Sequence, residues 1–223
     1  MKIIAHIHND FKEKFGIPRQ SGIADGIVSK IVFTKEYRSR EALRGIEGYS
    51  HLWLIWHFSE AEREEWSPTV RPPRLGGNKR MGVFATRSPF RPNPIGLSSV
   101  KLIGTQKSES QGSVLLVCGA DLLDGTPIYD IKPYLAYTDS HPDAVGGFSD
   151  TVRDYSLPVE FPQELISRVH TDKRDTLIRI LKDDPRPSYK DDGDRVYTFR
   201  FSDYEISFTV KDGILKVTDV TEV

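Results

Sequence analysis

The sequence has little of what a disulfide scaffold or a membrane anchor requires. Its single cysteine, Cys118, lies in an apolar run and has no second cysteine with which to pair. This favours a reducing compartment and a buried thiol. The longest apolar runs, at 52–56 and 114–118, contain five residues each, whereas a membrane-spanning helix needs about 20. We therefore expect a cytoplasmic protein with no membrane partner.

The common signatures of metal and nucleotide sites are also missing. The six histidines form no Cys/His pattern, so no metal is expected, and His6 with His8 is more simply a surface pair. The sequence contains no P-loop, no G-x-S-x-G elbow and no glycine fingerprint of a Rossmann fold. Any cofactor site must therefore be built in another way.

Acidic residues are absent from one long stretch. Between Trp66 and Ser108 there is no Asp or Glu, although the net charge of the whole chain is only −1. A local excess of positive charge favours a polyanionic ligand. The alternative is that acidic residues from elsewhere neutralise it in the folded protein. The basic residues of the stretch are Arg71, Arg74, Lys79, Arg80, Arg87, Arg91, Lys101 and Lys107.

What is present indicates a folded, mostly β protein. Hydrophobic residues make up 38% of the chain and charged residues 28%, which is typical of a globular protein and not of a disordered one. Short alternating runs joined by glycine and proline favour a barrel or sandwich. The nearly continuous apolar run 52–58 predicts a strand buried on both faces. The other predicted strands are 2–7, 26–33, 99–103 and 113–119, with a short helix at 40–45.

A second unit is predicted from about residue 155. Pro162 fits the start of a helix, and Asp183-Asp184-Pro185 fits the end of a helical region. Alternating runs then predict strands at 196–201, 204–210 and 215–220, with a hairpin turn at Lys211-Asp212-Gly213. We predict an N-terminal β domain, residues 1–154, and a small C-terminal α+β domain, residues 155–223.

Three segments carry unusual chemistry: 18–20, 71–96 and 121–134. Proline beside arginine keeps a long cation on a stiff backbone, which lowers the ordering cost of binding an anion. Arginine also matches the geometry of phosphate and carboxylate groups. The simpler explanation is that proline and glycine only shape the connections, and Asp124-Gly125 by itself is also a turn before a strand.

These segments resemble a known family, the bacterial tRNA methyltransferases called TrmO or TsaA-like, which act on threonylcarbamoyladenosine. The resemblance rests on long and unusual strings and covers nearly the whole chain. They are G-Y-S-H-L-W at 48–53, R-P-P-R-L-G-G-N at 71–78, G-V-F-A-T-R-S-P-F-R-P-N-P-I-G at 82–96, L-D-G-T-P-I-Y-D-I-K-P-Y at 123–134 and D-P-R-P-S-Y at 184–189.

The resemblance implies a β-barrel methyltransferase domain that is not of the Rossmann type, a homodimer, and S-adenosylmethionine as methyl donor. It implies a donor site built from the unusual segments. Ser59 and Glu60 fall in a variable part of the family. The implied donor contacts are Pro18, Arg19, Gln20, Ser59, Glu60, Arg87, Leu97, Leu123, Asp124, Gly125 and Thr126.

The chemistry of the implied acceptor suggests further residues. Its nitrogen belongs to a urea-like linkage and is a poor nucleophile, so a base within hydrogen-bond reach would help. Asp130 is our candidate base, oriented by Lys132 and the stiff step to Tyr134. The alternative is that Asp130 is a structural salt-bridge partner.

The implied RNA substrate is the anticodon stem-loop of tRNA. Cations would follow its phosphates, and aromatic rings would stack on its unpaired bases. The candidate RNA contacts are Arg71, Arg74, Lys79, Arg80, Phe90, Arg91 and Asn93. Two other functions remain open: a methyltransferase for a small molecule, and a non-catalytic S-adenosylmethionine-binding regulator.

Overall fold

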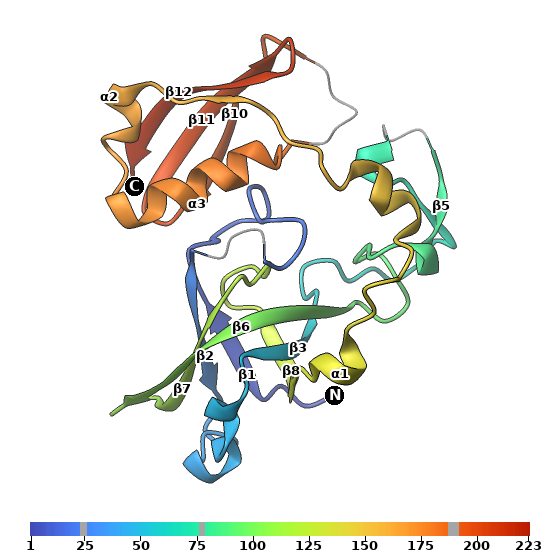
Figure 1. Ribbon diagram of the computed structural model, residues 1–223, viewed down its shortest axis with the longest axis vertical. Coiled ribbons are helices and arrows are strands. Elements are labelled where there is room, and N and C mark those ends of the chain that lie inside the picture. The colour runs from blue at the N-terminus through green and yellow to red at the C-terminus, as the bar shows by residue number, and fades with distance from the viewer. Residues whose placement is uncertain (23–25, 76–78, 187–191) are drawn as a thin grey trace.

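The computed structural model describes residues 1–22, 26–75, 79–186 and 192–223. It divides into two sheet-based modules, which Figure 1 shows one above the other, joined by a long connection that passes beside the β5 region. Mostly β structure is confirmed, and every helix but α3 is short within the described residues.

The first module is a ring of six antiparallel strands. The hydrogen-bonded order is β1-β2-β7-β6-β3-β8, and β8 pairs again with β1, so that the ring closes. Closure removes the free edges that an open sheet would expose. The strands are β1 (Ala5–His8), β2 (Val28–Phe33), β3 (His51–His57), β6 (Ile95–Ser108), β7 (Gly112–Cys118) and β8 (Pro127–Pro133).

Apolar side chains at alternate positions along the strands fill the interior of the ring. Leu52, Leu54 and Trp56 of β3 are buried in its core, while Trp53 and Ile55 between them are only half-buried. The prediction that this strand is buried on both faces is therefore wrong. Successive side chains of a strand point to opposite faces, and here only one face meets the core. The outer apolar residues line a hollow described below.

The second module is a four-stranded sheet with one long helix. The strand order is β10-β11-β12-β9, and β9 is parallel to β12. The predicted turn is confirmed, because Asp212 and Gly213 both have positive φ between β11 and β12. The elements are β9 (Val159–Glu160), α2 (Gln163–Ile166), α3 (Thr171–Lys182), β10 (Tyr197–Phe201), β11 (Tyr204–Lys211) and β12 (Ile214–Glu222).

Short elements fill the connections. The helix predicted at 40–45 is a single turn of 3-10 helix, η1 (Arg40–Leu43). In the long loop 59–94, two strands of two residues each pair antiparallel: β4 (Thr69–Val70) and β5 (Met81–Gly82). The remaining elements are η2 (Ile46–Gly48), η3 (Pro73–Leu75), η4 (Val83–Ala85), α1 (Ala136–Asp139) and η5 (Gly147–Val152).

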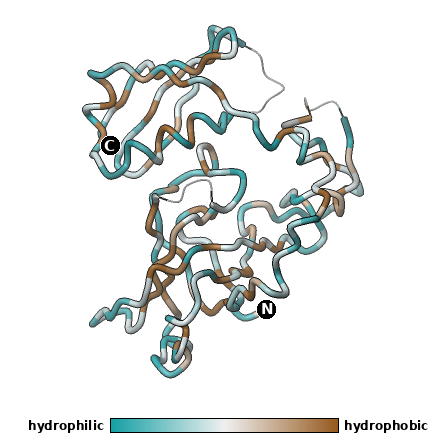
Figure 2. Tube along the Cα trace, viewed as in Figure 1, coloured by the Kyte–Doolittle hydropathy of each residue, from teal (hydrophilic) through white to brown (hydrophobic). Residues whose placement is uncertain are grey.

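The loop between β1 and β2 joins the two modules. Phe11 and Ile27, at its two ends, are buried in the hydrophobic core of the second module. A Cβ on Gly16 would lie 2.3 Å from the ring of Phe199, so this close packing requires glycine. Figure 2 shows hydrophobic stretches along both sheets, with more hydrophilic loop ends. Each module therefore has its own core, and residues 9–27 contribute to the second.

Candidate functional site

The segment 18–20 lies between the modules. Pro18 is buried, and the guanidinium of Arg19 donates hydrogen bonds to the backbone oxygens of Asp184 (3.3 Å) and Arg186 (2.5 Å). Gln20 is exposed, and its Oε1 accepts a hydrogen bond of 2.8 Å from Nη1 of Arg87. Two of the three unusual segments are thus in contact, and the C-terminal module positions one of them.

The turn before β8 brings in the third segment. Gly125 has a φ of 79°, and Thr126 is buried, while Leu123 is half-buried. Asp124 accepts hydrogen bonds from the backbone N–H of Asn9 (3.0 Å) and from Nζ of Lys12 (2.9 Å). Asp124 thus fastens the turn to the start of the loop 9–27.

Hydrogen bonds and nearby basic groups favour the ionised form of Asp124. Burial would raise the pKa of its carboxyl group, but the hydrogen bond from Lys12, the bond from the Asn9 N–H and the nearby His8 together lower the pKa below its ordinary value. The carboxylate form is therefore favoured, because these groups stabilise its negative charge.

The variable segment after β3 reaches the same loop. Ser59 and Glu60 are exposed. Nζ of Lys14 donates to the backbone oxygen of Glu60 (2.8 Å) and lies 3.2 Å from its carboxylate. All but one of the predicted donor contacts therefore lie in the loop 9–27 or are linked to it, directly or through a neighbouring residue. They are segment 18–20 within the loop, and 59–60, Arg87 and 123–126 outside it.

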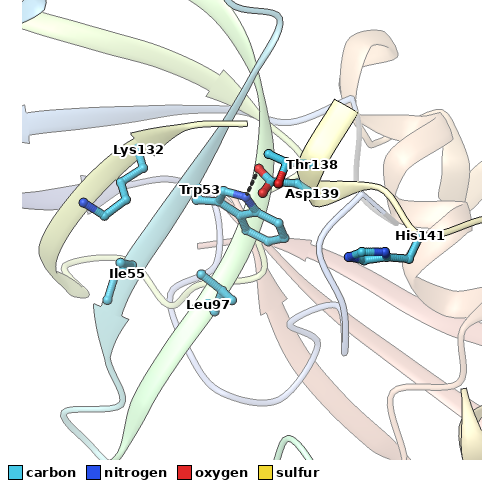
Figure 3. Close-up of a pocket in the computed structure, with 7 residues that line it drawn as sticks. All are labelled: Trp53, Ile55, Leu97, Lys132, Thr138, Asp139 and His141. Carbon is cyan, nitrogen blue, oxygen red and sulfur yellow. Dashed lines mark hydrogen bonds between the residues drawn. The ribbon is translucent and has the colours of Figure 1, made fainter. Parts of the chain in front are cut away.

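Leu97 is the exception among the predicted donor contacts. It points outward from β6 and is 56% exposed, and it lines an open hollow of about 340 Å³ on the outer face of the ring, which Figure 3 shows. The nitrogen of the Trp53 indole donates to the carboxylate of Asp139 at 2.8 Å across this hollow. The full lining is Trp53, Ile55, Leu97, Lys132, Thr138, Asp139 and His141.

The candidate base lies near the hollow. Asp130 pairs in register with Ile55, which lines it, and Oδ2 of Asp130 is 2.9 Å from Nζ of Lys132. Both side chains are about half exposed or more, at 46% and 62%. The ring of Tyr134 lies 5.4 Å from that of Trp53. The predicted ion pair between Asp130 and Lys132 is present. It is equally consistent with Lys132 orienting a catalytic Asp130 and with a purely structural salt bridge.

The predicted RNA contacts lie along the loop 59–94. Arg71, Lys79 and Arg80 are exposed, and Nη1 of Arg80 donates to Oγ1 of Thr69 at 3.1 Å. Asn93 is also exposed. Arg74 belongs to η3, but its side chain lies outside the described residues, as do residues 76–78. The loop therefore carries exposed cations near Arg87.

Aromatic rings accompany these cations. Phe90 is 39% exposed, and the guanidinium carbon of Arg63 lies 3.8 Å from its ring centroid. The predicted RNA contact Arg91 donates to the backbone oxygen of Thr86 at 3.2 Å. Its guanidinium carbon lies 5.9 Å from the ring of Phe84. Sequence reasoning found Phe90 and Arg91 here but missed Phe84, which follows a buried valine and carries no motif of its own.

In the parts of the chain that the structure describes, no helix is long and apolar enough to cross a membrane. No group of three His, Cys, Asp or Glu side chains among those same residues is arranged to bind a metal ion.

Comparison with known proteins assigns the chain to a family. Residues 6–140 match the tRNA-methyltransferase O N-terminal domain, and residues 154–223 match the TrmO C-terminal domain. The tRNA (adenine(37)-N6)-methyltransferase of Escherichia coli (strain K12) is 40% identical, covering 96% of this chain and 94% of that protein. The chain belongs to the tRNA-methyltransferase O family.

Two further relatives agree with this membership. A putative S-adenosylmethionine-dependent methyltransferase, RcsF, from Pseudomonas aeruginosa is 37% identical and covers 97% of this chain and 95% of that protein. A crystal structure of TrmO from P. aeruginosa is similar with a TM-score of 0.79 and 33% identity, covering 99% of this chain and 95% of that chain. The family resemblance of the sequence strings is thereby confirmed.

Asp121, which was not among the predicted donor contacts of this TrmO-family chain, lies beside two of the segments that were. Oγ of Ser98 donates to Oδ1 of Asp121 at 2.5 Å, and the indole nitrogen of Trp56 donates to the same Oγ at 3.0 Å. Burial raises the pKa of Asp121, and the bonds from Ser98 and Ser21 and the charge of Arg87 offset this only in part. A carboxyl group therefore lies next to both segment 18–20 and Arg87.

A carboxyl group in such surroundings can interact with a cation. S-adenosylmethionine carries a positive sulfonium, and a partly desolvated carboxylate stabilises a nearby cation more strongly than water-exposed charge does. The signal available in the sequence was the pair Asp121 and Asp124 around one turn. The sequence did not reveal that Lys12 donates a hydrogen bond to Asp124, whereas Asp121 accepts one from Ser98.

Proposed function

We propose that this chain transfers a methyl group from S-adenosylmethionine to N6 of threonylcarbamoyladenosine at position 37 of tRNA. The observation that carries the proposal is that the loop 9–27, which contains segment 18–20, contacts both Arg87 of the basic loop 59–94 and the turn 123–126. Membership of the tRNA-methyltransferase O family supports the reaction and the cofactor.

The donor site is proposed to consist of the segments gathered at the loop 9–27. The bound donor would supply a methyl group that is already activated by the sulfonium. Gln20 and Arg87, which hydrogen-bond to each other at 2.8 Å, would bind its polar ends. The turn Leu123–Thr126, fixed by Asp124, would approach it with backbone groups. Catalysis then rests on alignment of donor and acceptor.

Removal of the acceptor proton is proposed to involve Asp130. The Nζ of Lys132, 2.9 Å from Oδ2 of Asp130, restricts the orientation of that carboxyl group, and Tyr134 packs on the neighbouring Trp53. We expect Asp130→Asn to lower kcat by about 100-fold or more while the Kd for S-adenosylmethionine stays unchanged. Normal turnover in this variant would assign Asp130 to the salt bridge alone.

Leu97 is 56% exposed on the outer face of the ring, where it lines the hollow. We propose that the protein is a homodimer. Sedimentation of the purified chain would measure the assembly, and a Leu97→Glu variant that dissociates it would place Leu97 in the interface. A monomer at working concentrations would contradict the proposal.

Other parts of the proposal concern organisation and location. We propose that the six-stranded ring, within residues 1–154, is the β-barrel methyltransferase domain of a non-Rossmann class. Residues 155–223 would form the C-terminal domain. The anticodon stem-loop is the proposed partner, and the cytoplasm, where tRNA is modified, is the proposed location.

The deciding experiment is mass spectrometry of tRNA nucleosides after incubation with the protein and S-adenosylmethionine. We expect threonylcarbamoyladenosine to gain one methyl group. Arg87→Ala should abolish the product by weakening donor binding. Arg40→Ala, which removes an exposed arginine from η1, should leave the product unchanged and serves as the matched control.

The same experiment separates the two other functions. A regulator would bind S-adenosylmethionine without transferring its methyl group to tRNA or to any metabolite. A small-molecule methyltransferase would release labelled product from a metabolite extract while tRNA stayed unlabelled. Either result would overturn the proposal.

A further inference from the structure

The loop 59–94 exposes a cluster of aromatic rings. Phe84 is 73% exposed and Trp66 is 53% exposed, and their ring centroids lie 6.1 Å apart with an angle of 33° between the planes. Large exposed apolar groups in contact with each other usually mark a binding surface. We name Trp66, Phe84 and Phe90 the aromatic cluster of this loop.

The backbone fixes the position of this cluster. The N–H of Val83 donates to the backbone oxygen of Pro68 at 2.9 Å, and β4 pairs with β5. Val83 is 1% exposed, so η4 is anchored by a buried side chain directly before Phe84. Phe84 is therefore exposed directly after a buried residue, in a turn that follows β5.

Cations lie beside the rings. Arg63 lies over Phe90 with its guanidinium carbon 3.8 Å from the centroid, and Arg91 approaches Phe84 at 5.9 Å. Arg80 at the hairpin adds a further exposed positive charge. The glutamates of the loop, at positions 60, 62, 64 and 65, all precede Trp66, and the sequence has no acidic residue from Trp66 to Ser108. Stacking surfaces next to cations suit single-stranded nucleic acid, whose bases are flat and whose backbone is negative.

The cluster is also close in the chain to the proposed donor site. Arg87, which contacts Gln20 at 2.8 Å, follows Phe84 by three residues. A two-fold contact with a second copy of the chain would bring the same cations near one another, which is unfavourable. The charge pattern thus favours RNA over a second copy as the occupant.

We propose that Trp66 and Phe84 form a stacking platform for an unpaired base of the tRNA anticodon loop, next to the base that is methylated. The proposal rests on the proposed function and adds the surface that selects the single-stranded part of the substrate. Phe90 with Arg63 forms the adjacent edge of the platform, and Arg91 contacts a neighbouring phosphate.

The test compares variants of the full chain with tRNA that carries threonylcarbamoyladenosine. Trp66→Ala and Phe84→Ala should each raise the KM for tRNA by about tenfold or more, because stacking on one ring is worth about that factor. The Kd for S-adenosylmethionine should not change. Trp66→Phe should retain most of the wild-type KM. Tyr49→Ala, which removes an aromatic ring of 40% exposure outside the loop, is the matched control and should behave as wild type.

Salt dependence provides a second readout that loss of folding would not imitate. The aromatic variants should keep the wild-type slope of log affinity against log salt, since they remove no charge. Arg91→Ala should reduce the slope by about one phosphate contact. An unchanged KM in both alanine variants would overturn the platform, and so would conversion of a dimer to a monomer by these substitutions. If the wild-type protein methylates no tRNA, the proposed function itself fails, and the two failures are thereby distinguished.

Discussion

The sharpest prediction concerns Asp184, which lies where the two modules meet. Asp184 is 2% exposed, and its carboxylate accepts four hydrogen bonds from the described residues. Three come from Arg186, through the backbone N–H (3.2 Å), Nε (2.9 Å) and Nη2 (3.1 Å). The fourth comes from the hydroxyl of Tyr155 at 2.9 Å. The pKa of Arg186 is raised, because the carboxylate more than offsets the effect of burial.

Asp184→Ala should destabilise the protein strongly. Arg186 is only 7% exposed, so the substitution would leave a buried guanidinium without its counter-charge, which costs about 3–5 kcal/mol. The φ of 51° at position 184 adds strain for alanine, whereas aspartate tolerates this region better. Such a loss is a large part of a typical stability of about 5–15 kcal/mol.

Urea unfolding followed by circular dichroism measures this effect. The three tryptophans, at positions 53, 56 and 66, all lie in the N-terminal part of the chain. Their fluorescence therefore reports separately on that part. Glu36→Ala is the control, because Glu36 forms an exposed pair with Lys2 at 3.6 Å, and its midpoint should not move. A loss below about 1 kcal/mol for Asp184→Ala, the range of exposed pairs, would refute the reasoning.

The same variant also tests the link to the donor site. Arg19 donates to the backbone oxygens of Asp184 and Arg186. Disorder in this turn should therefore weaken binding of S-adenosylmethionine, measured by calorimetry under conditions where the variant is folded. An unchanged Kd would show that the segment 18–20 is positioned by the ring alone.

Three further predictions use simpler perturbations. Gly96→Ala should destabilise the ring by about 1–3 kcal/mol in thermal unfolding, because its Cβ would lie 2.2 Å from the Trp56 ring. Stability contributed by Asp124, whose pKa is lowered from 3.8, should be present above about pH 4 and lost as pH falls below that value. Lys12→Ala should shrink this acid-dependent loss in urea titrations at graded pH. Cys118 is 7% exposed and burial raises its pKa, so iodoacetamide should label it slowly in the native protein and fully after unfolding.

The local pattern of the sequence was sufficient for most of the strands. Period-two alternation located β10, β11 and β12 within two residues at each end, and Asp212-Gly213 located the hairpin between β11 and β12. These features depend on neighbouring residues alone, so they can be predicted without knowledge of the fold. The family strings were equally local, and they indicated the donor segments and the cofactor.

The tertiary structure decided which side chains meet. Arg19 and Arg186 are 167 positions apart in the chain, and Ser98 and Asp121 are 23 apart; no periodicity reports such pairings. It also decided that Leu97 points outward while Ser98 points inward, because the inner face of a strand is defined only once the ring has closed. Composition and motifs follow from the order of residues, whereas contacts follow from packing. Packing determined that the C-terminal module holds Arg19 of segment 18–20 through the backbone oxygens of Asp184 and Arg186.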